Sequence, residues 1–354
     1  MTPHDTAQSE GPFPRREAAT LAFRDVVKVY EGSTEPVIDH LTFDVGAGEI
    51  CVLVGPSGCG KTTAMRLVNR MIDLTEGDIL IGGRSVRDAD PAQLRREIGY
   101  VIQQIGLFPH QTVGENVAAV PRLLGWRKAR IAERVDELLE LVGLDPAATR
   151  DRYPAQLSGG QRQRVGVARA LAVDPPLMLM DEPFGAIDPI NRERLQNEFL
   201  RLQAQLRKTV VFVTHDIDEA IKMGDRIAVM KTGGRLAQYA TPAELLVNPA
   251  DDFVEGFVGA DRALKRLSLL RVRDIALDPA VVDDLGAVAP GAPVVRHDEV
   301  LRDALSELLQ AGAQQASVVE DGRVVGVLTV ELVGRLLATG DTAQEAPTER
   351  IGGA

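Results

Sequence analysis

The stretch "GPSGCGKTT", residues 55–63, matches the pattern G-x-x-x-x-G-K-[ST] and decides the fold class of this chain. It follows the apolar run "EICVLVG" and precedes the helical pattern "KTTAMRLVNRMI". A glycine-rich turn at this junction lets phosphate groups approach the first amides of the helix, which have no partners within it. The pattern therefore predicts a nucleoside triphosphate site in an α/β domain.

Each part of this loop has an expected task. Lys61 would neutralise the β- and γ-phosphates, and the hydroxyl of Thr62 would bind Mg²⁺. Cys59 needs no role in this chemistry, and we interpret it as a packing or neutral member of the loop. The residues expected to line the nucleotide are Gly55, Pro56, Ser57, Gly58, Cys59, Gly60, Lys61, Thr62 and Thr63.

An acidic pair follows the apolar run "LMLMD". At the end of such a strand Asp181 could reach the Mg²⁺ ion, while Glu182 could polarise an attacking water. That division of labour suits hydrolysis of a nucleoside triphosphate rather than transfer of its phosphoryl group. The alternative is an acidic turn that only caps a helix.

Two more polar residues end strand-like runs. His215, in "VFVTHD", could contact the γ-phosphate or the water, although a lone histidine also serves as a structural hydrogen-bonding residue. Gln103, at the end of "IGYVIQ", could reach both the metal and the water, or be a surface amide. The sequence therefore predicts catalytic roles for Glu182, His215 and Gln103, and metal binding by Thr62, Gln103 and Asp181.

A second candidate phosphate site occurs in "RYPAQLSGGQRQRVGVARAL", residues 152–171. This loop breaks into a helix through Ser158, Gly159 and Gly160. The unpaired amides of a helix start carry a partial positive charge and bind phosphate. One chain thus carries two stretches whose unpaired backbone amides could bind phosphate.

Composition limits the class of protein. The 354 residues are 45% hydrophobic, with a formal net charge of −11 and a pI near 5.1, which gives no electrostatic footprint for nucleic acid. The two cysteines, Cys51 and Cys59, are too few for a disulfide framework and fit a reducing cytoplasm. No apolar stretch approaches the roughly 20 residues of a membrane helix, so we expect any membrane role to depend on partners.

Patterning divides the chain into four parts. We expect a disordered leader over 1–19, an α/β domain with a helical insert over 20–260, a smaller unit over 262–340 and a flexible tail over 341–354. In the α/β domain, "LMLMD" and "TVVFVTH" lack alternation, as expected of parallel strands buried on both sides. The smaller unit reads as βαββα, with "LLRVRDI" as its first strand and a hairpin at Asp321-Gly322.

The order of "GPSGCGKTT", "VIQQ", "LSGGQ", "LMLMDE", "FGAIDP" and "FVTHD" resembles that of the nucleotide-binding subunits of ABC transporters, over residues 20–260. The resemblance implies a P-loop NTPase core with antiparallel β and helical subdomains. It also implies ATP rather than GTP, with Tyr30 stacked on adenine. The alternative for Tyr30 is an aromatic residue that only ends a strand.

In proteins of this kind two chains share each site, which explains the two anion-binding stretches. The resemblance implies a homodimer in which Ser158, Gly159, Gly160 and Gln161 cover the γ-phosphate of the ATP held by the other subunit's Lys61 loop. Asp188, in "GAIDP", would bridge the two sites. Ile187 stands where this family usually has Leu, a change of shape at equal volume that should cost little.

Three segments resemble the ATP-binding proteins of osmoprotectant importers for glycine betaine, carnitine or choline: "LRREIGYVIQQIGLFPH", "YPAQLSGGQRQRVGVARALAVDPPLMLMDEPFGAIDPI" and "NPADDFVEGFVGADR". This implies three kinds of partner: a second ATPase subunit, membrane permease subunits, and a periplasmic or lipid-anchored solute-binding protein, with no nucleic acid. It also implies a peripheral place on the cytoplasmic face of the inner membrane. Residues 105–110, "IGLFPH", could dock on the permease or anchor a buried loop.

The unit over 262–340 resembles a CBS repeat, which that group of importers often carries. Only one repeat is visible where pairs are usual, and Leu332 stands where nucleotide-binding repeats tend to have Asp. The unit could therefore regulate the ATPase or only support dimerisation and stability.

Two other functions stay open. One is an importer of another small polar solute such as an amino acid. The other is a soluble ABC ATPase that acts on DNA or ribosomes, which the single Lys61 loop, the lack of heptads and the acidic balance disfavour.

Overall fold

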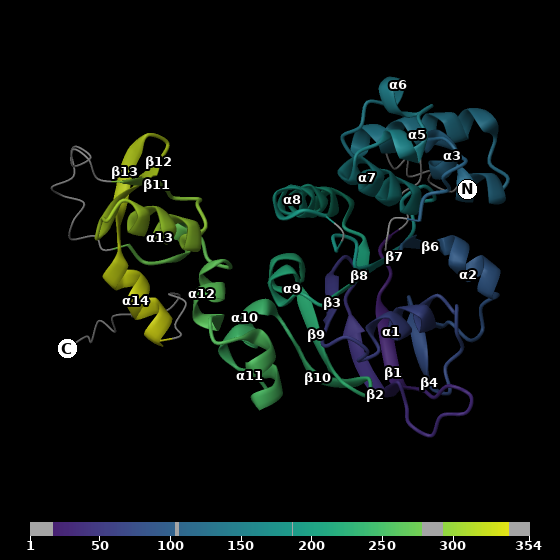
Figure 1. The fold of residues 1–354 in the computed structure, drawn as a ribbon, viewed down its shortest axis with the longest axis horizontal. Coiled ribbons are helices and arrows are strands. Elements are labelled where there is room, and N and C mark those ends of the chain that lie inside the picture. Colours follow the sequence, from purple (N-terminus) through teal and green to yellow (C-terminus); the bar gives the residue numbers. More distant parts are fainter. Residues whose placement is uncertain (1–16, 103–105, 186, 278–292, 340–354) are drawn as a thin grey trace, which may run out of the picture. The chain divides into compact units, whose positions relative to one another are not determined.

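The computed structural model describes residues 17–102, 106–185, 187–277 and 293–339 (Figure 1). The chain divides into two compact units, and the division falls between Thr241 and Pro242. The sequence pattern placed the end of the α/β domain near residue 260. By their contacts, helices α10 (Pro242–Val247) and α11 (Asp252–Val258) thus belong to the second unit.

A six-stranded sheet forms the centre of the first unit. Its strand order is β10-β9-β3-β8-β7-β6, and all neighbours are parallel except β9 and β10. Every residue of β3, β7 and β8 is buried. The prediction that "LMLMD" and "TVVFVTH" form buried parallel strands, β7 and β8, is confirmed. The strands are β3 (Ile50–Val54), β6 (Ile98–Val101), β7 (Leu177–Asp181), β8 (Thr209–Thr214), β9 (Arg226–Lys231) and β10 (Arg235–Ala240).

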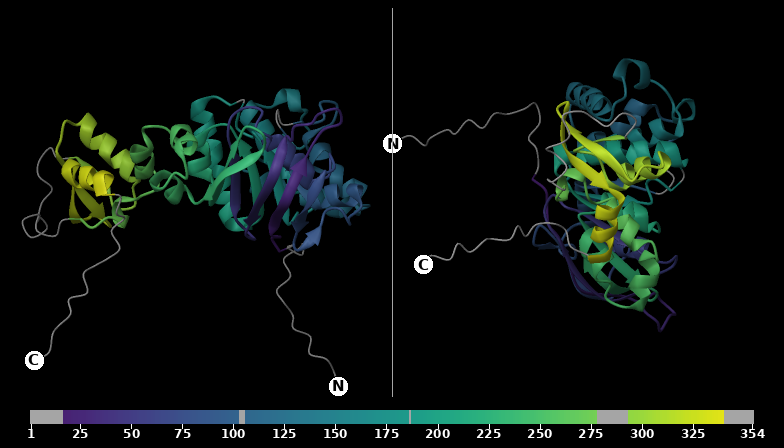
Figure 2. Two further views of the ribbon diagram at one scale, coloured as in Figure 1. Left: turned by 90° about the horizontal axis from the view of Figure 1, so that it is seen from below. Right: turned by 90° about the vertical axis from the view of Figure 1, so that its left-hand side faces the viewer.

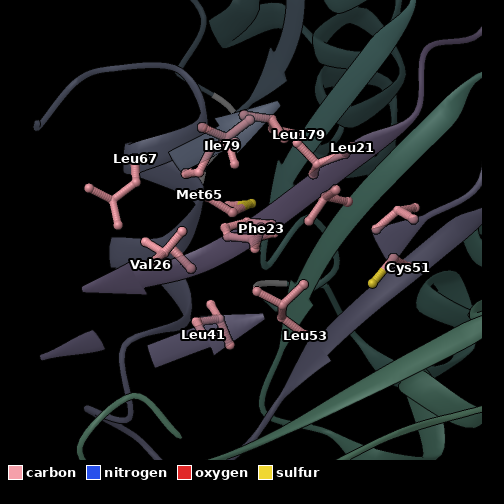
Figure 3. Packing of buried hydrophobic residues seen from close by; sticks show 14 of the residues in the cluster. Leu21, Phe23, Val26, Leu41, Cys51, Leu53, Met65, Leu67, Ile79 and Leu179 are labelled. Carbon is pink, nitrogen blue, oxygen red and sulfur yellow. The ribbon is translucent and has the colours of Figure 1, made fainter. Parts of the chain in front are cut away.

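A smaller antiparallel sheet packs against the first through one core. Its order is β2-β1-β4-β5, with bounds β1 (Leu21–Lys28), β2 (Ile38–Val45), β4 (Glu76–Ile81) and β5 (Arg84–Ser85). The rings of Phe23 and Phe43 stack at 4.5 Å on adjacent strands. Figure 3 shows side chains of β1 and β2 gathered with Leu53 of β3, Leu179 of β7 and Met65 of α1 (Lys61–Val68).

Helices complete the first unit. A group of short and medium helices lies together on one side of the six-stranded sheet (Figure 1). The helical pattern over residues 113–124 forms two of these helices, which are divided at Ala118. The second of these accommodates Pro121 at its third residue, where the missing N–H costs no helical bond. The bounds are α2 (Pro91–Glu97), α3 (Val113–Val117), α4 (Ala119–Leu123), α5 (Lys128–Leu141), α6 (Pro146–Thr149), η1 (Pro154–Gln156), α7 (Gly159–Ala170), α8 (Pro189–Leu206) and α9 (Ile217–Met223).

The second unit contains a three-stranded sheet of order β11-β12-β13 (yellow in Figure 2). The predicted hairpin is confirmed, because Asp321 and Gly322 both have positive φ, as a two-residue type I′ turn requires. The bounds are α12 (Arg262–Leu267), η2 (Val272–Asp274), β11 (Val294–Arg296), α13 (Leu301–Gln310), β12 (Gln315–Glu320), β13 (Arg323–Thr329) and α14 (Val330–Thr339).

The predicted strand "LLRVRDI", residues 269–275, is wrong. Its centre is a single 3-10 turn, closed by the carboxylate of Asp274, which accepts from the N–H of Arg271. Val272 and Arg273 donate to the carbonyls of Glu299 and His297, so the segment is tied to the loop before α13 and makes only one isolated bridge. The first strand of the βαββα order is instead β11.

Candidate functional site

The glycine-rich loop joins β3 to α1 at the centre of the six-stranded sheet. Two of its glycines are required by close backbone approach. A Cβ on Gly55 would lie 2.3 Å from the carbonyl oxygen of Met230, and one on Gly60 would lie 2.7 Å from that of Val37. Only glycine therefore fits at these positions, and the loop is held against its neighbours in one conformation.

Lys61 is buried and curls back over this loop. Its ammonium group donates to the carbonyls of Gly55, at 2.7 Å, and Pro56, at 2.9 Å, and lies 3.7 Å from the sulfur of Cys59. Cys59 is itself fully buried, which agrees with its interpretation as a packing residue. The loop thus keeps a positive charge close to its own backbone.

Thr62 and Asp181 lie together, as the sequence predicts. The hydroxyl of Thr62 donates to Oδ1 of Asp181 at 3.3 Å, from the first turn of α1 to the end of β7. Burial raises the pKa of the Asp181 carboxyl, while the bond from Thr62 opposes the rise. A hydroxyl beside a poorly solvated carboxylate fits Mg²⁺, which takes oxygen ligands and binds through one or two carboxylates together with phosphate oxygens.

Glu182 and His215 also meet. Nδ1 of His215 lies 3.1 Å from Oε1 of Glu182, a distance at which the ring N–H donates to the carboxylate. These residues follow the neighbouring strands β7 and β8, so the parallel register brings them to one edge of the sheet. Glu182 has φ of +42°, a conformation that costs a non-glycine residue about 1 kcal/mol or more and that occurs at functional sites.

Gln103, the remaining predicted catalytic and metal-binding residue, lies outside the described residues. The described strand that leads to it, β6, is parallel to β7.

The second candidate anion-binding stretch begins helix α7. Ser158 and Gln161 form a reciprocal cap, because the hydroxyl of Ser158 accepts from the N–H of Gln161 at 3.2 Å and the side chain of Gln161 accepts from the N–H of Ser158 at 3.0 Å. Gly159 and Gly160 are not buried. Within the described parts of the chain, no hydrogen bond links Ser158–Gln161 to the Lys61 loop of the same molecule.

Asp188 and Tyr30 are both exposed, Asp188 at the start of α8 and Tyr30 just after the end of β1. Asp188 caps α8, and its carboxylate accepts from the backbone and side-chain amides of Asn191, which lowers its pKa. Tyr30 follows β1 with its ring 40% exposed, and the Lys28 ammonium lies 5.2 Å from the ring centre. Both side chains are thus available at the surface of a single chain.

Asn116, a fully buried residue on α3, was not predicted from the sequence. Its side chain accepts from the N–H of Phe108 at 2.8 Å and donates to the carbonyls of Phe108, Gln111 and Thr112. This amide therefore holds the loop before α3. The available signal was a short amide residue at a helix position where the pattern expects an apolar one.

Comparison with known proteins gives a consistent result. Residues 38–185 match the family described as ABC transporter. The osmoprotectant import ATP-binding protein OsmV of Salmonella typhimurium is 56% identical over 245 residues, which are 69% of this chain and 64% of that protein, so the chain matches somewhat less than two thirds of this relative. The choline transport ATP-binding protein OpuBA of Bacillus subtilis is 45% identical over 332 residues, 94% of this chain and 84% of that protein.

Among solved structures, a dimeric post-hydrolysis state of the ATP-binding cassette MJ0796, bound to ADP and Pi, has a TM-score of 0.55 and 34% identity. The match covers 63% of this chain and 98% of that one.

Proposed function

This chain belongs to the ABC transporter family, and from that membership we propose that it is the ATP-hydrolysing subunit of an importer that takes up quaternary-amine osmoprotectants. The family and the fold predicted from the motif order are confirmed, with a P-loop core, an antiparallel sheet and a helical group. The names of several relatives, which refer to osmoprotectants, choline, carnitine and glycine betaine, support the solute class.

The observation that carries the hydrolytic role is the pair Glu182 and His215 beside the pair Thr62 and Asp181. We assign to Glu182 the orientation of the attacking water, and to His215 the orientation of Glu182 and contact with the γ-phosphate. Thr62 and Asp181, with Gln103, would hold Mg²⁺, which neutralises charge on the phosphates when bound. Lys61 would exchange its bonds to the loop carbonyls for bonds to phosphate oxygens.

We further propose a head-to-tail homodimer with two shared sites. The absence of a hydrogen bond between Ser158–Gln161 and the Lys61 loop, within the described residues of one chain, fits a role of the α7 start toward another molecule. The capped helix start offers amides to an anion. The neighbouring cassette MJ0796 is dimeric, which supports this arrangement.

The loop before α3 is our candidate for contact with the membrane permease. The backbone of Phe108 is held by Asn116, yet its side chain is 42% exposed. A rigidly anchored loop with an exposed aromatic ring suits docking, and it disfavours the alternative of a buried loop anchor. Across the described residues no helix is long and apolar enough to cross a membrane.

In this proposal the subunit lies on the cytoplasmic face of the inner membrane and would work with permease subunits and a periplasmic or lipid-anchored solute-binding protein. Its second unit would regulate the ATPase. In that unit the hydroxyl of Thr329 accepts from the N–H of Leu332 at 3.1 Å and so caps α14. This use of Thr329, together with Leu332 in place of Asp, favours regulation through pairing with the same domain of another subunit rather than through a bound nucleotide.

Reconstitution tests the proposal as a whole. The subunit is combined in liposomes with a candidate permease from the same genome, and ATP hydrolysis is measured with a solute-binding protein loaded with glycine betaine, choline or an amino acid. Stimulation by the quaternary amines supports the proposal. Stimulation by an amino acid alone would favour the alternative importer, and hydrolysis that responds to no permease would refute the transport role.

A further inference from the structure

A buried polar pair joins helix α8 to helix α9. Nε2 of Gln196 donates to Oε1 of Glu219 at 2.9 Å, and the two residues are only 5% and 7% exposed. Burial raises the pKa of the Glu219 carboxyl, while hydrogen bonds from Thr214 and Gln196 oppose the rise. Two apolar side chains would pack at this position without the desolvation cost of a buried amide and carboxyl group. The hydrogen bond of the polar pair instead specifies the position of one helix on the other.

The pair connects toward the start of α8 through Arg192, one turn earlier on the same helix. Nη2 of Arg192 donates to the carbonyl of Ile187 at 3.1 Å. Nη1 of the same guanidinium lies 3.9 Å from Oδ2 of Asp216. Arg192 thereby connects the turn that carries Asp188 to Asp216, the N-cap residue of α9.

In the other direction the pair connects to the catalytic edge of the sheet. Asp216 caps α9 by accepting from the N–H groups of Asp218 and Glu219, and its own N–H donates to the hydroxyl of Thr214. Thr214, which also bonds to Glu219, is the last residue of β8. His215 lies between Thr214 and Asp216, so both of its neighbours are held by this network, and its ring reaches Glu182.

We propose that Arg192, Gln196, Asp216 and Glu219, which we term the α8–α9 clasp, are positioning residues that transmit the position of the Ile187–Asp188 turn to His215 and Glu182. The inference rests on the homodimer of the proposed function, together with the expectation from the sequence that Asp188 bridges its two sites. Docking of the second subunit against the turn would shift α8, and the clasp would carry the shift to the residues that orient the attacking water. The effect falls on turnover rather than on ATP binding.

The decisive experiment is an exchange of the two clasp residues in the full-length protein. Gln196→Glu alone sets two carboxylates against each other in a buried place, and we expect kcat for ATP hydrolysis to fall by about tenfold or more, with KM for ATP changed less than about twofold. The double variant Gln196→Glu/Glu219→Gln restores a donor opposite an acceptor. It should recover kcat to within about twofold of the wild type.

A matched control uses the same two helices. Glu193 and Lys222 form an exposed α8–α9 ion pair at 3.7 Å that touches neither Thr214 nor the Ile187 carbonyl. Glu193→Gln should leave kcat unchanged, because exposed pairs contribute little. An equal loss of kcat in Glu193→Gln, or failure of the double variant to recover, would overturn the clasp.

A spectroscopic measurement covers the case in which Gln196→Glu folds poorly. Gln196→Met removes the donor at nearly the same volume, and the ¹⁵N shifts of the His215 ring, assigned with His215→Gln, should move in the nucleotide-free protein. Unchanged shifts together with unchanged kcat overturn the inference alone. A wild-type protein without ATP hydrolysis would overturn the proposed function first, and the inference with it.

Discussion

The ring of His215 lies 3.1 Å from the carboxylate of Glu182, across the ends of two neighbouring parallel strands. The contact exists in a single chain, before any nucleotide or second subunit is added. The geometry of the Glu182–His215 pair, to which we assign the orientation of the attacking water, is therefore largely built by the sheet itself. What remains for the nucleotide and the partner is to complete the site around it.

Replacement of this carboxylate should separate binding from hydrolysis. We expect Glu182→Gln to bind ATP with normal affinity and to lose at least about 10²-fold in kcat, since the amide is a poor general base. ATP-bound dimers should then accumulate and be visible by size-exclusion chromatography. Lys61→Ala is the control and should lose ATP binding itself, and near wild-type hydrolysis by Glu182→Gln would show that another group orients the water.

Mixing two inactive variants tests whether sites are shared between chains. In a heterodimer of Lys61→Ala and Ser158→Arg subunits, both defects fall on one site and the other site is intact. Hydrolysis should reappear in the mixture at up to about half the wild-type rate per heterodimer, as expected for two independent sites. Tagged heterodimers without activity above either parent would count against sharing.

Loss of the exposed ring of Phe108 should uncouple transport from hydrolysis. Phe108→Ala keeps the Asn116 bonds to the backbone, so the isolated ATPase activity and the melting temperature should stay near those of the wild type. Solute uptake by the reconstituted complex should fall by about tenfold, the effect of losing one interface anchor. Met71→Ala, which removes another exposed apolar side chain, is the matched control, and equal losses in both variants would exclude a specific contact.

Removal of residues 260–354, which form most of the second unit, should change the response to salt. The chain around this cut carries partly exposed ion pairs such as Arg262 with Glu255 at 2.9 Å and Lys265 with Asp261 at 3.2 Å. Such contacts weaken with salt, because the screening length falls from about 10 Å at 0.1 M to about 3 Å at 1 M. We expect transport by the full chain to rise with internal salt and a chain truncated after Gly259 to lose that dependence. The same salt activation in both would exclude the unit as a sensor.

Glu219 should make stability depend on pH in a defined direction. Its pKa is raised in the folded protein, so between the unfolded and folded values the folded state binds more protons and stability falls as pH rises. Above the folded pKa the cost is constant. The stability of Glu219→Gln relative to the wild type should therefore increase with pH from about 4.5 upward and then level off, as followed by urea unfolding. A difference that does not vary with pH would contradict the assignment.

The parts of the site that lie at strand ends could be predicted from sequence, because a polar residue that directly follows a fully apolar parallel strand lies at the carboxyl edge of the sheet. Asp181, Glu182 and His215 lie at the ends of neighbouring strands for that reason. The Gln196–Glu219 pair could not be predicted, since its partners lie on two amphipathic helices and are recognised as buried only when the helices pack. The segment 269–275 misled for a related reason, because its apolar pattern suits a strand but its amides find partners in a loop.

The folded-back ammonium of Lys61 changes what nucleotide affinity measures. The ammonium is already buried in the folded chain and already donates hydrogen bonds to two carbonyl oxygens. A phosphate that binds this ammonium would replace the two carbonyl acceptors by phosphate oxygens. The ammonium would lose no further water in that step, because it is already buried. With Lys61 assigned to phosphate binding, nucleotide affinity at this loop would measure an exchange of one set of acceptors for another. A change that weakens the bonds of Gly55 and Pro56 to the ammonium would then strengthen nucleotide binding without contacting the nucleotide.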